Sequence, residues 1–212
     1  MDDATLLLAW LLVALVGVMT PGPDTLLVLR HTLLSSRRAG FATVIGIAVG
    51  YLGWACASLA GLTALLAASQ LAYDLVRIAG AAYLIWLGGA AIWHSFHRQL
   101  PAGGLVNAPQ TKMGTWTALR TGAVTNLLNP KVGVFYISIL PQFLPSGSGA
   151  LAWGAMLVGI HITVTFAWFT LIIWTAGKAR RLLLNETMRA WLDRISGMVM
   201  VSVGVKLATE TR

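Results

Sequence analysis

Two ionisable side chains, Asp24 and Lys131, stand where long apolar segments are interrupted by proline. Asp24 closes the motif TPGPD at 20–24, and Lys131 closes the motif TNLLNPK at 125–131. A carboxylate at the first position can bind an ammonium group or a proton, and an ammonium at the second can bind a carboxylate. A charge at the centre of a membrane helix costs about 2.5–3.5 kcal/mol on insertion scales. The two positions therefore predict a ligand site, provided that the segments that carry them cross a membrane.

The prolines of both motifs interrupt helical hydrogen bonding. Proline lacks a backbone N–H and clashes with the preceding turn, so each motif frees carbonyl and amide groups. In hydrocarbon such groups must meet protein, water or a ligand. The helices that begin after the motifs also direct positively polarised N-termini at the breaks, and these suit a carboxylate. The candidate site residues that shape this backbone are Pro21, Gly22, Pro23 and Pro130.

Three further polar residues extend the candidate site. Asn126 and Asn129 offer side-chain amides to the second break. His161 is the histidine that lies deepest in an apolar segment, and histidine can relay protons. Other interpretations stay open, because the prolines can serve packing alone, Asp24 can cap a helix and Lys131 can extend to the membrane interface. The two asparagines and the histidine can likewise serve backbone bonding or core packing.

The composition indicates which elements must position these residues. The 212 residues are 57% hydrophobic and 10% charged, with a mean hydropathy of +0.76, whereas a soluble domain carries about 25% charged residues. A soluble enzyme, a disordered regulator and a solenoid are therefore not expected. Cys56 is the single cysteine, so neither an intrachain disulfide nor a cysteine-based metal site is expected. The class is an integral membrane protein.

Apolar stretches of about 20 residues predict membrane-spanning helices. We predict an all-α fold of six such helices in a single membrane domain over 1–212, with the first and fourth broken at the proline motifs. The last span is the weakest, because only 11 uncharged residues separate Arg194 from Lys206. The predicted spans are 6–30, 41–66, 75–93, 118–140, 150–174 and 192–209.

The basic residues predict the orientation of these helices. The formal net charge is +8, and 11 of the 15 Lys and Arg residues belong to the connections that follow the first, third and fifth spans. Positive charges favour the cytoplasmic side. Both termini are therefore expected on the side of the membrane opposite the cytoplasm. This distribution accounts for the basic pI of about 10.4 without a nucleic-acid partner.

The two motifs also predict an internal repeat, because Asp24 and Lys131 lie 107 positions apart and each motif precedes an apolar helix, a turn and a glycine-rich helix. Three helices per repeat give the two copies opposite membrane orientations. Inverted repeats with matched helix breaks are typical of transporters that bind substrate near the midplane. The expected repeats are about 1–97 and 115–212, joined by a cytoplasmic loop at about 94–117.

Short segments in a fixed order carry a family resemblance. They are 20–25 (TPGPDT), 37–41 (RRAGF), 46–50 (GxxxG), 80–88 (GAAYLIWLG), 126–131 (NLLNPK) and 195–197 (ISG), with Gly204 near the end. Together they resemble the lysine-exporter (LysE) superfamily and, within it, the homoserine/threonine-resistance (RhtB-like) branch. The resemblance covers nearly the whole chain.

The resemblance implies a six-helix secondary exporter rather than an enzyme. Its substrates would be amino acids or their derivatives, such as homoserine, threonine or leucine, moved across the inner membrane by the proton gradient. The expected partners are the amino acid, protons and the lipid bilayer, a homo-oligomer is left open, and neither a cofactor nor a metal is expected. The Pro-Gly-Pro and Asn-Pro-Lys segments are implied to matter for transport.

Other functions fit parts of the sequence less well. A divalent metal-ion efflux protein would use His31, His94 or His97 as ligands, but no acidic or cysteine partners accompany these histidines. An intramembrane hydrolase would pair a serine of segment 146–149 with His161, but that segment is a predicted turn. ATP-driven transport is disfavoured because the phosphate-binding motif G-x-x-x-x-G-K-[ST] does not occur.

Overall fold

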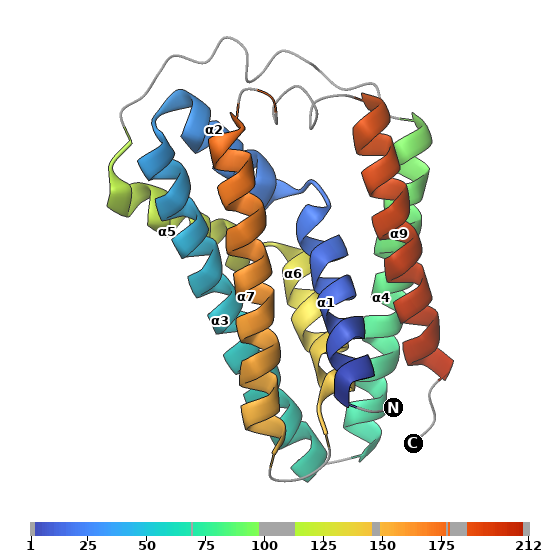
Figure 1. Ribbon diagram of the computed structural model, residues 1–212. Helices are drawn as coiled ribbons and strands as arrows, with labels where there is room; N and C mark the ends of the chain where they lie inside the picture. Colours follow the sequence, from blue (N-terminus) through green and yellow to red (C-terminus); the bar gives the residue numbers. More distant parts are fainter. Residues whose placement is uncertain are drawn as a thin grey trace.

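The helices form an elongated bundle (Figure 1). In this computed structural model the described residues are 3–68, 70–97, 113–145, 149–176, 178 and 186–209, and no strand occurs among them. The all-α class is therefore confirmed. In chain order the helices are α1 (Asp3–Met19), α2 (Pro23–Leu34), α3 (Arg37–Ala68), α4 (Gln70–His97), α5 (Thr115–Leu127), α6 (Pro130–Val134), the π-helix η1 (Phe135–Ile139), the 3₁₀-helix η2 (Leu140–Phe143), α7 (Ala150–Trp174) and α9 (Glu186–Thr209).

Both proline motifs bend the chain where the sequence places them. α1 and α2 meet at 55°, and α5 meets the helical segment Pro130–Phe143 at 57°. Pro23 and Pro130 each occupy the first turn of a new helix, where the N–H that proline lacks has no helical partner in any case. At the second break, Asn129 Oδ1 accepts a 3.1 Å hydrogen bond from the backbone N–H of Lys131 and so caps the new helix.

The number of membrane crossings is supported only in part. Two stretches, Arg37–Gly61 and Ala150–Trp174, are long and apolar enough to cross a membrane, and four segments qualify if each bent pair counts as one span. α4 contains a shorter apolar stretch, Ile78–Trp93. In the described part of the chain, α9 does not qualify, and α9 carries the span that the sequence marks as weakest. Six spans therefore stay a prediction.

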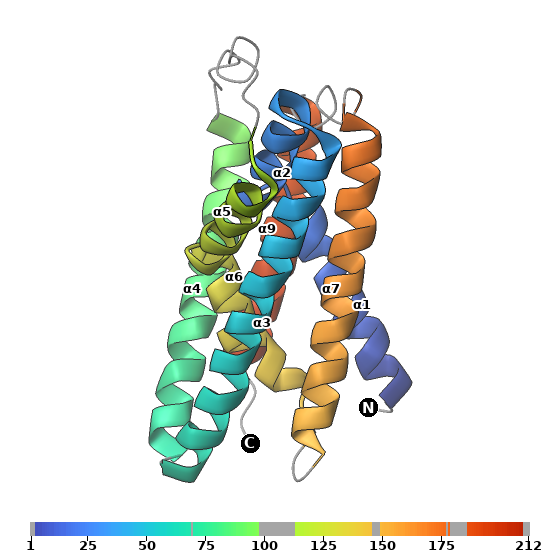
Figure 2. The ribbon, with the colours of Figure 1, turned by 90° about the vertical axis from the view of Figure 1, so that its left-hand side faces the viewer.

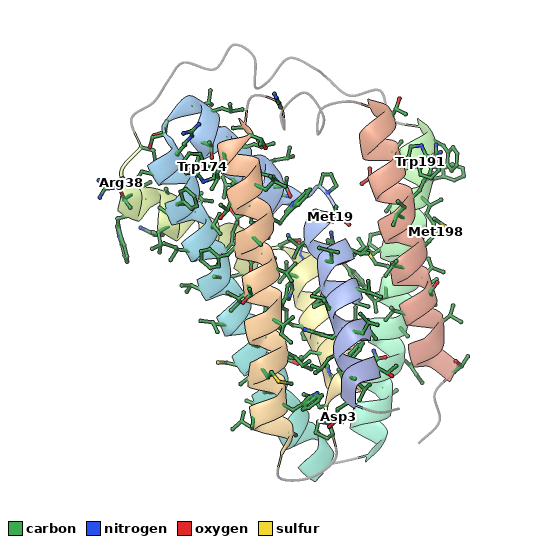
Figure 3. All side chains as sticks on the ribbon, in the orientation of Figure 1. Asp3, Met19, Arg38, Trp174, Trp191 and Met198 are labelled. Carbon is green, nitrogen blue, oxygen red and sulfur yellow. The ribbon has the colours of Figure 1, made fainter. Side chains whose placement is uncertain are left out.

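The ends of the helices separate into two groups. At the upper end in Figure 1, α4 and α7 finish and α3 and α9 begin, whereas α1, α4 and α7 begin at the lower end and α3 and α9 finish there. This grouping is the one expected if the basic connections share one side. Figure 3 shows Met19, the last residue of α1, closer to the end marked by Arg38 and Trp174 than to the end marked by Asp3. The first break therefore lies inside the bundle but away from its middle.

Glycines allow α3 and α5 to approach each other closely (Figure 2). A Cβ atom at Gly46 would collide with the backbone oxygen of Leu119, and one at Gly122 would collide with the backbone oxygen of Thr43. α4 and α9 pack together in the same way, through a glycine on each helix. Such contacts are typical of helices that associate in membranes. The seam between α3 and α5 fixes the position of the second break.

A buried tryptophan fixes α1 against α7. Trp10 is fully buried, and its Nε1 donates a 2.8 Å hydrogen bond to the backbone oxygen of Leu157. Its ring also packs against Phe135 and Phe143, with centroid distances of 5.5 and 5.2 Å. A buried indole needs a partner for its N–H, so this bond sets the height of α1 along α7. The first break follows the end of α1, so the same bond also fixes the position of this break.

Candidate functional site

The two helix breaks meet through a pair of polar side chains. Asn126, near the end of α5, donates a 2.8 Å hydrogen bond from Nδ2 to Oδ2 of Asp24, near the start of α2. Asp24 is 7% exposed and Asn126 is fully buried. The capping role that the sequence left open for Asp24 is not observed, because the capping position of α2 is Gly22 and no side chain bonds to the backbone there. The carboxylate thus joins the breaks to each other.

This pair leaves two buried acceptor oxygens without a donor. Neither Asp24 Oδ1 nor Asn126 Oδ1 has a hydrogen-bond partner among the described residues. Asn129 approaches Asp24 and Tyr51 approaches Asn126, yet neither donates to these Oδ1 atoms. A buried polar atom without a partner is costly and is uncommon in folded proteins. Because Asp24 also lines a cavity, its Oδ1 is a candidate acceptor for a ligand that donates hydrogen bonds, such as an ammonium group.

Lys131 reaches the first break from the second. Its Nζ donates a 3.2 Å hydrogen bond to the backbone oxygen of Gly17, in the last turn of α1. The carbonyl oxygens at the end of a helix lack helical partners, so this bond satisfies one of them with a cation, where the helix dipole also favours it. Asp24 and Lys131 attract each other across the site, but each group bonds to another partner. Lys131 therefore does not extend to an interface.

A cavity of about 40 Å³ lies between the two breaks. A volume of this size holds a few water molecules and is smaller than an organic substrate, so binding requires the breaks to move apart. The polar residues in its wall are Thr20, Asp24, Thr25, Tyr51, Asn129 and Lys131.

The predicted site residues take different positions around this cavity. Gly22 lies in its wall with Asp24, Asn129 and Lys131, whereas Asn126 stands behind Asp24 and holds it. The prolines of the motifs are not part of the wall. They are Pro21, Pro23 and Pro130, and they act by ending one helix and starting the next.

His161 lies next to the cavity rather than in its wall. It is 4% exposed on α7, and its Nδ1 lies 3.1 Å from the hydroxyl of Tyr136. The ring of Tyr51 lies against the imidazole, with 4.6 Å between the centroids. Tyr51 also lies within hydrogen-bonding reach of Thr165. Because Tyr51 itself lines the cavity, it connects His161 to the charged pair.

The partner of His161 stands in an irregular part of the backbone. Tyr136 belongs to the π-helix η1, and its backbone oxygen accepts a 2.7 Å hydrogen bond from Ser58 Oγ on α3. From the 3₁₀-helix η2 that follows, Gln142 Nε2 donates a 2.5 Å hydrogen bond to the backbone oxygen of Ser138 in η1. π-Helical turns are rare and frequently mark functional sites. Here the irregular turn presents a tyrosine hydroxyl to a buried histidine.

Sequence reasoning did not identify Tyr51, Thr20, Thr25 or Phe169 as part of the site, although all four line the cavity. The two threonines flank the TPGPD motif, and this neighbourhood is the signal that could have pointed to them. Tyr51 lies in an uncharged stretch of α3, where a tyrosine usually packs or anchors at an interface. Its role follows only from the packing of α3 against α7 and the second break.

The described residues that the alternative functions would use form no second site. His31 is buried, and its Nδ1 lies 2.7 Å from Thr43 Oγ1, so it serves the packing of α2 on α3. Among the described residues, no group of three or more His, Cys, Asp or Glu side chains could hold a metal ion. The side chains of His94 and His97 lie outside the described part of the structure, as do residues 146–148.

Comparisons with known proteins support one family. A family model described as LysE type translocator matches residues 15–211. The chain is 28% identical over 205 residues to the uncharacterized membrane protein YrhP of Bacillus subtilis (strain 168), covering 94% of this chain and 97% of that protein. It is 27% identical over 200 residues to a threonine efflux protein of Escherichia coli (strain K12), covering 92% and 94%. It is also 27% identical over 199 residues to a leucine efflux protein of Enterobacter sp. (strain 638), covering 91% and 90%. No solved structure matches the chain.

Proposed function

We propose, from the premise that the chain belongs to the LysE type translocator family, that it exports amino acids across a bacterial inner membrane. Members of this family are transporters rather than enzymes, as the sequence resemblance predicted. The relatives named for threonine and leucine efflux agree with the homoserine/threonine-resistance branch. The substrate of this chain is then an amino acid or a derivative such as homoserine, threonine or leucine.

The observation that carries this proposal is the pairing of opposite charges in one cavity. Asp24, whose Oδ1 has no donor, and Lys131 both line this cavity. An amino acid zwitterion matches both groups, because its ammonium can donate to Asp24 Oδ1. Its carboxylate can then accept from Lys131 Nζ in place of the backbone oxygen of Gly17. Charge-assisted hydrogen bonds of this kind are stronger than neutral ones.

The same oxygen of Asp24 also suits proton coupling. A proton and a substrate ammonium compete for one buried carboxylate, so the site holds one or the other. Such competition makes exchange of an outgoing amino acid for an incoming proton possible. His161, Tyr136 and Tyr51 form a chain of groups that can carry a proton next to this site. We therefore assign coupling to Asp24 with His161 as its relay.

The proposed transport cycle uses two halves, about 1–97 and 115–212. Each half contributes one bent helix pair, and the two bends differ by little. Matched breaks at a shared site support an inverted repeat that alternates access to the two sides. In this arrangement six helices cross the membrane, and both termini face the periplasm.

The test is an export assay in cells loaded with single amino acids. Cells that express the chain are compared with cells that carry an empty vector, and the release of threonine, homoserine, leucine, alanine and lysine is followed. We expect faster release of at least one neutral amino acid, and loss of that difference after the proton gradient is collapsed. Equal release of every amino acid from both cell lines contradicts export. Release that continues unchanged without the gradient contradicts coupling.

A further inference from the structure

A second cavity, of about 20 Å³, adjoins the charged site at Gly17 and Lys131. Gly17 and Lys131 belong to the walls of both cavities, so the hydrogen bond between them forms the partition. The rest of the second wall is apolar and comes from both halves of the chain. Its side chains include Val13, Val16, Leu84, Phe135, Ile139 and Val203.

We propose that this second cavity receives the side chain of the transported amino acid and selects aliphatic side chains. The inference rests on the proposed function, because it needs an amino acid whose charged groups occupy the first cavity. In any amino acid the side chain branches from the carbon that also bears the ammonium and the carboxylate. With the carboxylate on Lys131, the side chain lies next to the partition and enters the apolar cavity.

The walls determine which side chains are accepted. Leu84, Phe135 and Ile139 are buried and the lining side chains of α1 and α9 are half-buried, so the cavity wall is mostly hydrocarbon. Apart from Lys131 and the backbone of Gly17, no polar residue lines it within the described part of the chain. A hydroxyl or charged group placed there would leave water without gaining a partner, which is unfavourable. Valine, leucine, isoleucine and methionine side chains meet no such penalty. At about 20 Å³ the cavity holds only about one water molecule, so it must widen together with the first cavity to take them.

Valine and threonine provide the sharpest comparison, because they have nearly the same shape and differ by a methyl group against a hydroxyl. We expect valine to leave loaded cells at least about tenfold faster than threonine at equal internal concentration, in line with the selectivity of hydrophobic pockets. If no amino acid leaves faster than from control cells, the proposed function fails. If amino acids are exported but threonine leaves as fast as valine, the apolar subsite is wrong and export stands.

Substitutions of Val203 on α9 change the volume of the second cavity and so test the proposed subsite. Val203→Phe should fill the cavity and lower leucine export roughly tenfold or more relative to alanine export, since alanine has too short a side chain to enter. Val205→Phe is the matched control, because Val205 lies on the same helix and is 47% exposed. It should leave the leucine-to-alanine ratio unchanged. Val203→Ala, which enlarges the cavity, should raise methionine export relative to valine.

The ratios make the test independent of expression and folding. Retained alanine export shows that a Val203→Phe chain is folded and inserted, so a selective loss of leucine supports the proposal. An unchanged leucine-to-alanine ratio in Val203→Phe overturns it. So does a methionine-to-valine ratio that does not rise in Val203→Ala, which keeps the proposal testable should the larger side chain prevent folding.

Discussion

Asn126 donates its side-chain amide to Asp24 Oδ2 at 2.8 Å, although 102 positions separate the two residues in the chain. The bond joins the end of α5 to the start of α2, and the bond from Lys131 to Gly17 joins the second break to the end of α1. The charged residue of each break is therefore held by a helix of the other break. The second oxygen of Asp24 has no partner among the described residues, and Asp24 lines the cavity. Asp24 therefore belongs both to the contact between two helices and to the wall of the cavity.

Replacing Asp24 by asparagine should lower export at least tenfold while leaving the amount of protein in the membrane unchanged. The amide keeps the size of the carboxylate and can still bond to Asn126, but it offers an ammonium group no negative charge and cannot exchange a proton. Initial rates of release from loaded cells measure the effect. Asp3→Asn is the matched control, because Asp3 is exposed at the start of α1. Normal export by Asp24→Asn contradicts the site assignment.

Replacing Lys131 by methionine should also lower export at least tenfold. Methionine has a similar length but provides no charge for the substrate carboxylate and no donor for Gly17. The rate of release of the best exported amino acid is measured at several internal concentrations. Lys178→Met removes an exposed lysine and should have no effect. A Lys131→Met chain with the same release curve as the native chain excludes Lys131 from binding.

Replacing Gly50 by alanine should disturb the site by displacing Asn126, which holds Asp24. A Cβ atom there would lie 2.5 Å from Asn126 Oδ1 and 2.8 Å from its Cβ, so Asn126 would have to move away from Asp24. Gly50→Ala should lower export roughly tenfold and destabilise the fold by about 1–3 kcal/mol, as overpacked cores do. Thermal unfolding in detergent and the export assay measure the two effects.

Gly61→Ala is the control on the same helix. Nothing lies within 4 Å of a Cβ atom at Gly61, so this change should leave export intact and keep or slightly raise stability. Equal behaviour of the two glycine variants would show that the contact with Asn126 is unimportant.

The proposed relay role of His161 can be tested by comparing two kinds of transport. His161→Gln and Tyr136→Phe each remove one side of the 3.1 Å contact between these residues. We expect both variants to retain exchange of labelled for unlabelled amino acid, which needs no net proton movement. Release driven by the proton gradient should fall at least about fivefold. Similar losses in exchange and in driven release would instead indicate a structural role.

The orientation can be tested with reporter enzymes that are active only in the periplasm. A fusion after Arg212 should be active and a fusion inside the loop at about 94–117 should be silent, because three basic connections are expected in the cytoplasm. Fusion proteins with equal abundance provide the comparison. A silent reporter after Arg212 argues for an odd number of crossings, and α9 is then the helix that fails to cross.

Local chemistry made the helix breaks predictable from the sequence. A proline bends the chain where it interrupts an apolar helix, and the two observed bends lie at Pro23 and Pro130. The bond between Asn126 and Asp24 was not predictable, since it depends on how α5 packs on α3. Tyr51 was missed for the same reason, because a lone tyrosine on an apolar helix gives no local sign of its neighbours.

The hydrogen bond from Lys131 to Gly17 also has a consequence for metabolites that bear a single charge. An organic acid could displace Gly17 from the lysine, but it would bring nothing for Asp24. An alkylamine could bond to Asp24, but it would leave the lysine held by the end of α1. Only a molecule with both an ammonium and a carboxylate group offers a donor to Asp24 and also takes the place of Gly17 on Lys131. The carrier should therefore retain the cell's simple acids and amines while its amino acids leave.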